Sequence, residues 1–138
     1  MIVWDNGTKK QRVYEIWEDN FHDPVSYANF YFNEVYGKNE VLLNEEMSAD
    51  ENLVKGMLHL NPYTLHVKGQ PAEVKYIVGV ATDEEYRRQG VMRELLVKTF
   101  QELRSRGELF TYLMPADENY YLPFDFRFGM AQVEQELE

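Results

Sequence analysis

The stretch EEYRRQGVMRELL, residues 84–96, contains three arginines, a glutamine and a glycine ahead of apolar residues spaced three to four apart. The first turn of a helix has backbone N–H groups without partners in the helix, and the helix dipole adds roughly half a positive charge there. Gly90 lets the backbone approach a ligand closely, and Arg87, Arg88 and Arg93 add positive charge. The residues therefore favour phosphate binding at this helix start.

The same spacing also fits a surface helix with a basic start, so spacing alone leaves both interpretations open. The stretch is not a P-loop, because no Gly-Lys-Ser/Thr follows, and it is not the dinucleotide-binding GxGxxG motif.

Composition restricts the classes of function. The 138 residues suit one domain, and a content of 44% hydrophobic residues supports a real core. The net charge is −10, yet residues 87–106 contain six basic and two acidic side chains. An acidic protein is a poor general binder of nucleic acid and attracts cations such as amines. The chain has no cysteine, which excludes thiol catalysis and disulfides, and we expect no metal cofactor.

No stretch approaches the roughly 20 apolar residues of a membrane span, and the N-terminus MIVWDNGTKK lacks the layout of a signal peptide. We therefore expect a cytoplasmic protein without a membrane partner.

Hydrophobic periodicity and turn residues predict an α+β domain with a mixed, mostly antiparallel sheet flanked by helices. A first strand is expected near residues 1–4. Thr8 is expected to cap a helix with Val13, Ile16 and Trp17 on one face, and Asp23-Pro24 to open a second helix that ends at Gly37. The predicted elements that follow are strands 41–45, 52–60 and 63–69 with a turn at Asn61-Pro62, a long central strand 73–82, a helix from Gly90 to Gly107, a strand at 109–114, a turn or helix at 116–121 and a last strand near 126–134.

The segment VATDEEYRRQGVMRELL, residues 80–96, resembles the coenzyme A-binding segment of the GCN5-related N-acetyltransferase (GNAT) superfamily. The signature Arg/Gln-x-x-Gly-x-Gly/Ala corresponds to residues 87–92, with Met92 in place of the usual small residue. That departure is similar to the enhanced-intracellular-survival (Eis) type of acetyltransferase. The resemblance extends over most of the chain, including IWEDNFHDPVSYANFYF (16–32) and PADENYYLPFDF (115–126).

The resemblance implies a GNAT-like acyl-CoA N-acyltransferase fold in which a bulge splays the central strands around acetyl-CoA. Gly79 suits such a bulge, although a plain strand glycine fits equally well. By the resemblance, the backbone of Val80, Ala81 and Thr82 pairs with the pantetheine arm. The implied cofactor-binding residues are Val80, Ala81, Thr82, Arg87, Arg88, Gln89, Gly90, Val91, Met92, Arg93 and Asn119, the last of which is equally well explained as a cap.

Acyl transfer to an amine needs a deprotonated amine, a donor to the oxyanion and a proton for the departing thiolate. NYYLPFDF, residues 119–126, resembles the family stretch in which a tyrosine acts as general acid, and that position is Tyr121. Asp125 replaces a glycine of the family, so the resemblance does not determine the conformation of the local turn. Without the resemblance, Tyr121 is one of 10 tyrosines that can pack in a core.

No general base is identified from the sequence. His22, His59 and His66 are candidates because an unperturbed imidazole changes charge near neutral pH, but His59 and His66 on strands are better explained as structural residues. Three glutamates, Glu34, Glu40 and Glu45, can act through water. In the Eis-like branch the base is associated with the C-terminal carboxylate of a longer chain.

We therefore expect an N-acetyltransferase that uses acetyl-CoA as co-substrate and transfers its acetyl group to a primary amine by direct attack in a ternary complex. The acidic surface favours a cationic small-molecule or peptide acceptor, and aromatic residues of the first two helices can line its pocket or pack in the core, namely Trp17, Phe21, Tyr27, Phe30 and Tyr31. A non-catalytic acyl-CoA-binding or regulatory module is the alternative, and a scaffold without cofactor is the third interpretation.

The predicted domain spans residues 1–138, either as a minimal relative or as the N-terminal part of a longer chain. A missing last strand would leave a sheet edge that invites a homo-oligomer.

Overall fold

A computed structural model describes residues 1–48, 52–108 and 111–113. The elements are β1 (Ile2–Trp4), α1 (Lys10–Asn20), α2 (Val25–Phe30), a π-helical turn η1 (Tyr31–Val35), β2 (Glu40–Met47), β3 (Asn52–Val67), β4 (Gln70–Thr82), a 3₁₀ turn η2 (Glu84–Tyr86), α3 (Val91–Ser105) and β5 (Thr111–Leu113). The strands form one sheet in the order β1-β2-β3-β4-β5, antiparallel except for the parallel pair β4 and β5. This confirms the predicted α+β class and the β-α-β unit around α3.

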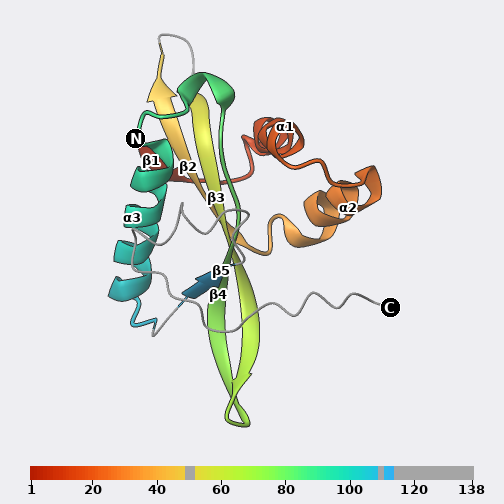
Figure 1. Ribbon diagram of the computed structural model, residues 1–138, viewed down its shortest axis with the longest axis vertical. Coiled ribbons are helices and arrows are strands. Elements are labelled where there is room, and N and C mark those ends of the chain that lie inside the picture. The colour runs from red at the N-terminus through yellow and green to blue at the C-terminus, as the bar shows by residue number, and fades with distance from the viewer. Residues whose placement is uncertain (49–51, 109–110, 114–138) are drawn as a thin grey trace.

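The sheet separates two hydrophobic clusters. Figure 1 shows α3 on one side of the sheet and α1 and α2 on the other. Side chains alternate along β2, so Val41 and Leu43 join the cluster under α1 while Leu42 joins the cluster under α3. Burial of each such aliphatic side chain contributes about 1.5–3 kcal/mol, so both helices are held on the sheet by apolar contact.

Both predicted helix caps are wrong. Helix α1 begins after Lys9 without a side-chain cap, because the Thr8 hydroxyl donates to Asn6 Oδ1 at 2.8 Å instead. Helix α2 begins after Pro24, one residue later than predicted, and has no side-chain cap. The Asp23 carboxylate accepts a hydrogen bond from the indole Nε1 of Trp17 at 3.0 Å, so it serves a different donor. The predicted ends are confirmed, since Gly37 and Gly107 follow the helical segments with φ of 95° and 76°.

The predicted turn at Asn61-Pro62 is also wrong. Strand β3 continues through it to Val67, and Pro62 pairs with Lys75 of β4. Pairing of β3 with β2 ends at Leu60, so the next residues form an edge where the missing N–H of a proline is tolerated. The chain turns instead at Lys68 and Gly69, which both have positive φ, as a two-residue hairpin turn requires. The resulting β3–β4 arm extends beyond the rest of the sheet (Figure 1).

Strand β4 lies between β3 and β5 as predicted, although β3 is the longer strand. The strand predicted at 109–114 is described only at Thr111–Leu113. The elements predicted at 116–121 and near 126–134 lie outside the described residues.

Candidate active site

Strand β4 contains a bulge at Gly79 and Val80. Met57 pairs with Ala81 and His59 with Val78, so these two β4 residues lie opposite the single residue Leu58. Gly79 has a φ of 61°, and a Cβ added there would lie 2.7 Å from His59 Cδ2 and 2.8 Å from Trp17 Cζ3. Only glycine fits both the backbone and the space. The predicted bulge is confirmed, and the plain strand glycine is excluded.

Beyond the bulge, β4 offers a backbone edge. Its pairing with β5 covers Lys75–Ile77, and in the described part of the chain the residues from Val78 onward have no partner on that side. Val80 packs toward the cluster under α3, and Ala81 belongs to the cluster under α1. The predicted pantetheine-binding residues Val80, Ala81 and Thr82 therefore continue directly from the bulge along this edge.

The turn after β4 leads into an open helix start. Gly90 is the N-cap of α3 with φ of 78°, and a Cβ added there would meet nothing within 4 Å. The first helical bond runs from Glu94 N to Gly90 O at 3.0 Å, so the amides of Val91 and Met92 have no acceptor within α3. Arg88 adopts a φ of 64°, a conformation that costs about 1 kcal/mol outside glycine and that clusters at ligand sites.

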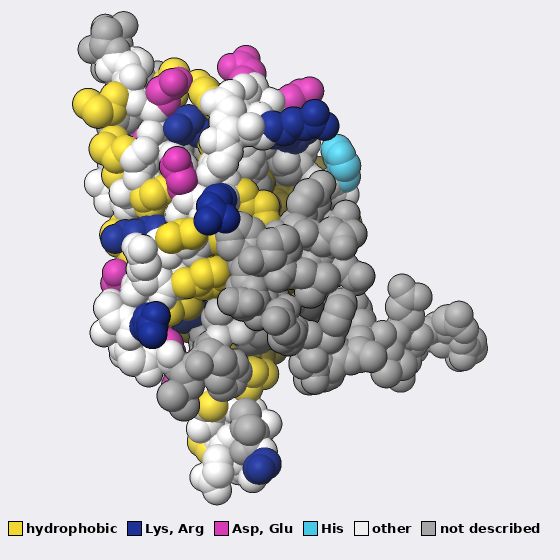
Figure 2. Space-filling model, turned by 60° about the vertical axis from the view of Figure 1, so that its left-hand side comes forward, with side chains coloured by type: hydrophobic (Ala, Val, Ile, Leu, Met, Phe, Trp, Pro, Cys, Tyr) yellow, Lys and Arg dark blue, Asp and Glu magenta, His cyan; other side chains and the backbone are white. Residues whose placement is uncertain are grey.

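The predicted phosphate-binding residues fall together at this helix start. Arg87, Arg88, Gln89, Gly90 and Arg93 are exposed, Met92 is half-buried, and Val91 is buried under the helix. The Gln89 amide donates to Glu85 O at 3.4 Å. On the α3 face, Lys and Arg side chains lie among exposed hydrophobic ones (Figure 2). Backbone donors and positive charge thus occupy one surface, as an anion site needs.

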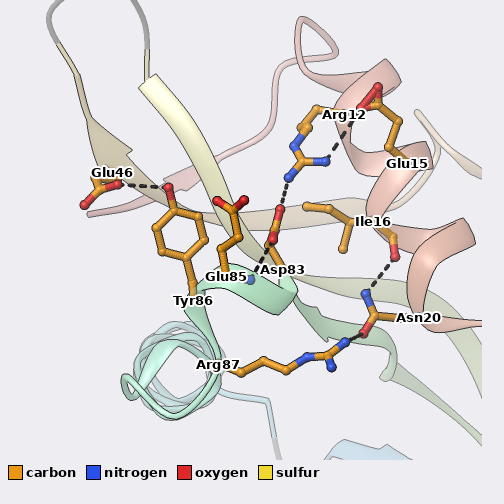
Figure 3. A network of polar contacts seen from close by, with 9 residues as sticks. All are labelled: Arg12, Glu15, Ile16, Asn20, Glu46, Asp83, Glu85, Tyr86 and Arg87. Carbon is orange, nitrogen blue, oxygen red and sulfur yellow. Dashed lines mark hydrogen bonds and ion pairs between the residues drawn. The ribbon is translucent and has the colours of Figure 1, made fainter.

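Contacts from α1 fix this turn in place (Figure 3). The Asp83 carboxylate accepts from Glu85 N at 3.0 Å and pairs with the Arg12 guanidinium. Arg87 donates to Asn20 Oδ1 at 2.9 Å, and the Asn20 amide donates to a carbonyl of α1. Sequence analysis did not find Arg12 and Asn20, because these partners lie 71 and 67 residues away from Asp83 and Arg87.

A buried polar network lies beneath the bulge. His59 is fully buried, with Nδ1 3.0 Å from the Tyr31 hydroxyl and Nε2 3.4 Å from Met57 Sδ. Burial lowers the pKa of His59 to about 3 and raises the pKa of Tyr31 to about 12. Asn39 and Asn61 complete the network, with Nδ2 of Asn39 donating to the Tyr31 hydroxyl at 3.1 Å and to Asn61 Oδ1 at 2.8 Å. His59 is thus a neutral structural residue, as the sequence favoured.

The other candidate bases are scattered. His22 is exposed between α1 and α2, and His66 is exposed near the tip of the β3–β4 arm, opposite Pro71. The hydrogen bond from Arg106 lowers the pKa of Glu40, which also pairs with Lys75. Glu34 is exposed and Glu45 is 6% exposed on β2. The described residues therefore do not single out a base.

A pocket of about 410 Å³ opens between α1, α2 and the bulge. Its lining is Trp17, Phe21, Asp23, Pro24, Tyr27 and Gly79. Of the five aromatic residues expected near an acceptor, three line it, whereas Tyr31 is buried beneath and Phe30 is 57% exposed outside its lining. Asp23 was considered only as a cap, and its place in the pocket was not anticipated.

The proposed acid Tyr121, the cofactor contact Asn119 and the departure at Asp125 lie outside the described residues. In the described ranges, no group of three His, Cys, Asp or Glu side chains could hold a metal ion. No helix within those ranges is long and apolar enough to cross a membrane.

No curated protein matches the chain. Solved structures of similar fold include an Enterococcus faecalis protein described as a probable N-acyltransferase, with 15% identity and a TM-score of 0.77 over 90% of this chain and 31% of that one. A predicted acetyltransferase from Clostridium acetobutylicum, solved with acetyl-CoA, has 14% identity and a TM-score of 0.77 over 99% and 97% of the two chains. A GNAT family acetyltransferase from Brucella melitensis in complex with acetyl-CoA has 15% identity and a TM-score of 0.71 over 93% and 82%.

These similarities show the GNAT fold, and this chain spans less than a third of the length of the Enterococcus protein. The family described as Acetyltransferase (GNAT) domain matches residues 6–129. The chain therefore belongs to the GNAT acetyltransferase domain family.

Proposed function

We propose that this protein is an N-acetyltransferase that transfers the acetyl group of acetyl-CoA to a primary amine by direct attack in a ternary complex. One observation supports it most: the bulge at Gly79, the backbone edge after it and the open helix start at Gly90 follow one another in a chain of this family. We also propose that residues 1–138 form one domain that resembles the Eis-like branch, on the basis of Met92 in the signature.

The geometry of the backbone supports the proposed cofactor roles. Val80, Ala81 and Thr82 would hydrogen-bond the pantetheine arm as an added strand does. The amides from Arg88 to Arg93 would hold the pyrophosphate, and the arginine charges would attract it. The open space at Gly90 supports this role, since a phosphate can approach the backbone there without displacing a side chain.

In the proposed reaction the neutral amine nitrogen forms a bond to the acetyl carbon and the carbon–sulfur bond breaks. The thiolate receives a proton from the Tyr121 phenol, the amine nitrogen loses one to solvent, and solvent returns a proton to the Tyr121 oxygen. A phenol has an ordinary pKa near 10 and stays protonated at neutral pH, so Tyr121 would donate a hydrogen bond that stabilises the developing thiolate.

The test is to supply acetyl-CoA and a panel of primary amines and to follow the release of free thiol. Tyr121→Phe is expected to lower kcat by about 100-fold or more, the usual loss for a general acid. Tyr120→Phe removes a neighbouring hydroxyl and serves as the control with kcat near wild type. Undiminished turnover in Tyr121→Phe would remove the proposed acid.

A second candidate is a non-catalytic module that binds acyl-CoA. The state of His59 favours it, because this residue is buried and neutral and both ring nitrogens have partners. This function predicts coenzyme A binding in calorimetry without thiol release for any amine. A scaffold without cofactor predicts an unchanged Tm in saturating acetyl-CoA. A bound ligand at about 100 times its Kd would instead add about 2.7 kcal/mol to the free energy of unfolding and raise the Tm.

A further inference from the structure

The pocket beside the bulge combines aromatic walls with a carboxylate. Trp17, Phe21 and Tyr27 provide the rings, and Asp23 is the charged residue among the described lining residues. The indole Nε1 donates to Asp23 Oδ2 at 3.0 Å and fixes the carboxylate at the wall. A volume of about 410 Å³ suits a small molecule. Aromatic faces beside a fixed carboxylate bind an organic ammonium group, by cation–π attraction and by a charge-assisted hydrogen bond.

The helices over this pocket have a charge opposite to that of the phosphate turn. Residues 13–36 contain five acidic side chains, Glu15, Glu18, Asp19, Asp23 and Glu34, and no lysine or arginine. The basic residues from Arg88 to Arg106 lie on and beside α3, on the other side of the sheet, whereas the Arg87 side chain donates to Asn20 at the end of α1. The pocket therefore attracts a cation, while the anionic cofactor is drawn to the α3 start.

An ammonium held by Asp23 cannot be the nucleophile, because a nearby carboxylate stabilises the charged form and attack needs the neutral amine. A substrate with a single amino group would be held there in its unreactive form. A substrate with two amino groups can place one ammonium at Asp23 and direct the second toward Gly79, which lines the same pocket. Gly79 belongs to the bulge from which the proposed cofactor edge begins.

We propose that the acceptor is a small diamine or polyamine, recognised through one ammonium group by Asp23, Trp17 and Tyr27, and acetylated on another. This inference rests on the proposed function for its chemical step, but the recognition it describes is a binding property.

Calorimetry with coenzyme A present separates the two properties. Putrescine and n-butylamine have the same four-carbon chain and differ by one amino group. Both are expected to bind with similar affinity through one ammonium at Asp23. Only putrescine has a second amine for the attack, so thiol release from acetyl-CoA is expected to be at least about tenfold faster with putrescine. Lysine amide with an acetylated α-amine, which has one free amine on a longer body, is expected to bind like n-butylamine.

Asp23→Asn keeps the shape and an acceptor for the indole while it removes the charge. It is expected to weaken the binding of putrescine and of n-butylamine about tenfold and to leave coenzyme A binding nearly unchanged. Asp19→Asn is the matched control, because it makes the same charge change four residues earlier, at an exposed α1 residue outside the pocket.

Tyr27→Leu keeps an apolar wall and removes the aromatic face. It is expected to weaken putrescine binding threefold to fivefold, about the size of an exposed cation–π contact. Tyr27 is 49% exposed, so the variant is expected to fold; Tyr63→Leu, at a 54% exposed tyrosine of the β3–β4 arm, is the control.

No measurable binding of either amine, or equal effects of Asp23→Asn and Asp19→Asn on that binding, would overturn the inference. Thiol release that is as fast with n-butylamine as with putrescine would also overturn it while leaving the proposed function intact. Putrescine binding that Asp23→Asn weakens and Asp19→Asn does not, without thiol release, would contradict the proposed function and support the recognition.

Discussion

Two polar networks on the α1 side of the sheet differ in burial and in charge. One joins Tyr31 and His59 beneath the bulge and contacts α1 through Trp17, whose ring stacks on Tyr31 at 4.5 Å. The other joins α1 to the turn after β4 through Arg12 and Asp83, with 35% and 17% of these side chains exposed. The first is neutral and enclosed, and the second is charged and in contact with solvent.

The difference assigns each network a role. No buried side-chain nitrogen or oxygen among the described residues lacks a partner, so a change in the His59 network leaves a group unsatisfied at a high cost. The Asp83 network can exchange its partners with water at a low cost. The floor of the pocket is therefore expected to be rigid, and the phosphate turn adjustable.

The largest effect that we expect from this contrast is the pH dependence of the free energy of unfolding. His59 has a folded pKa of about 3 against an ordinary value of 6.5, so between these values the unfolded chain binds a proton that the folded chain does not. Stability contributed by neutral His59 is complete above pH 6.5 and is lost as pH falls, with a slope of up to about 1.4 kcal/mol per pH unit. Urea unfolding between pH 7 and pH 4 measures it.

Carboxylates titrate in the same range, so the comparison is with His59→Gln. That variant is expected to be less stable at pH 7 and to lose less stability per pH unit than the wild type. Parallel stability curves for the two proteins would contradict the burial of a neutral imidazole.

Substitution of Gly79 by alanine tests the rigidity of the pocket floor. The new Cβ would meet the rings of His59 and Trp17 at less than 3.0 Å, and the positive φ adds strain. We expect a loss of about 2–4 kcal/mol in the free energy of unfolding. Gly69→Ala is the control, because Gly69 also has a positive φ but nothing lies within 4 Å of the added Cβ. Equal losses in the free energy of unfolding for the two variants would mean that the packing beneath the pocket relaxes to accommodate the new methyl group.

Tyr31→Phe removes one hydroxyl from the buried network. Asn39, His59 and Asn61 each lose a partner, so we expect a loss of about 1–3 kcal/mol in chemical denaturation. Tyr14→Phe removes an exposed hydroxyl of α1 that donates to Glu18, and it is expected to cost less than about 0.5 kcal/mol. If the two substitutions cost the same, burial does not determine the value of these hydrogen bonds.

The same contrast explains which features the sequence predicted. Gly90 and the apolar spacing of α3 are local signals, and the open helix start and the β-α-β unit followed from them. The bulge at Gly79 was implied by the family resemblance, because the glycine alone fitted a plain strand equally well. The prediction of a turn at Asn61-Pro62 is wrong because β2, which is distant in the sequence, ends opposite Leu60 and leaves the next residues of β3 at an edge of the sheet. The prediction of Asp23 as a cap is wrong because its carboxylate accepts from the Trp17 indole and not from an amide of α2. Long-range polar partners such as Arg12 and Asp83, 71 residues apart, leave no local pattern.

The smallest expected effect lies in the exposed network and concerns function more than stability. A double-mutant cycle with Arg12→Gln and Asp83→Asn should give a coupling of about 0.5–1 kcal/mol, which falls in high salt because the pair is partly exposed.

Arg12 also pairs with Glu15 at 3.6 Å on α1, and Glu15→Gln is the control that leaves the turn untouched. If α1 positions the turn, Arg12→Gln should weaken coenzyme A binding severalfold while Glu15→Gln should not. A large coupling that salt does not reduce would show that this network is as rigid as the buried one, and the division between a fixed floor and an adjustable turn would have to be abandoned.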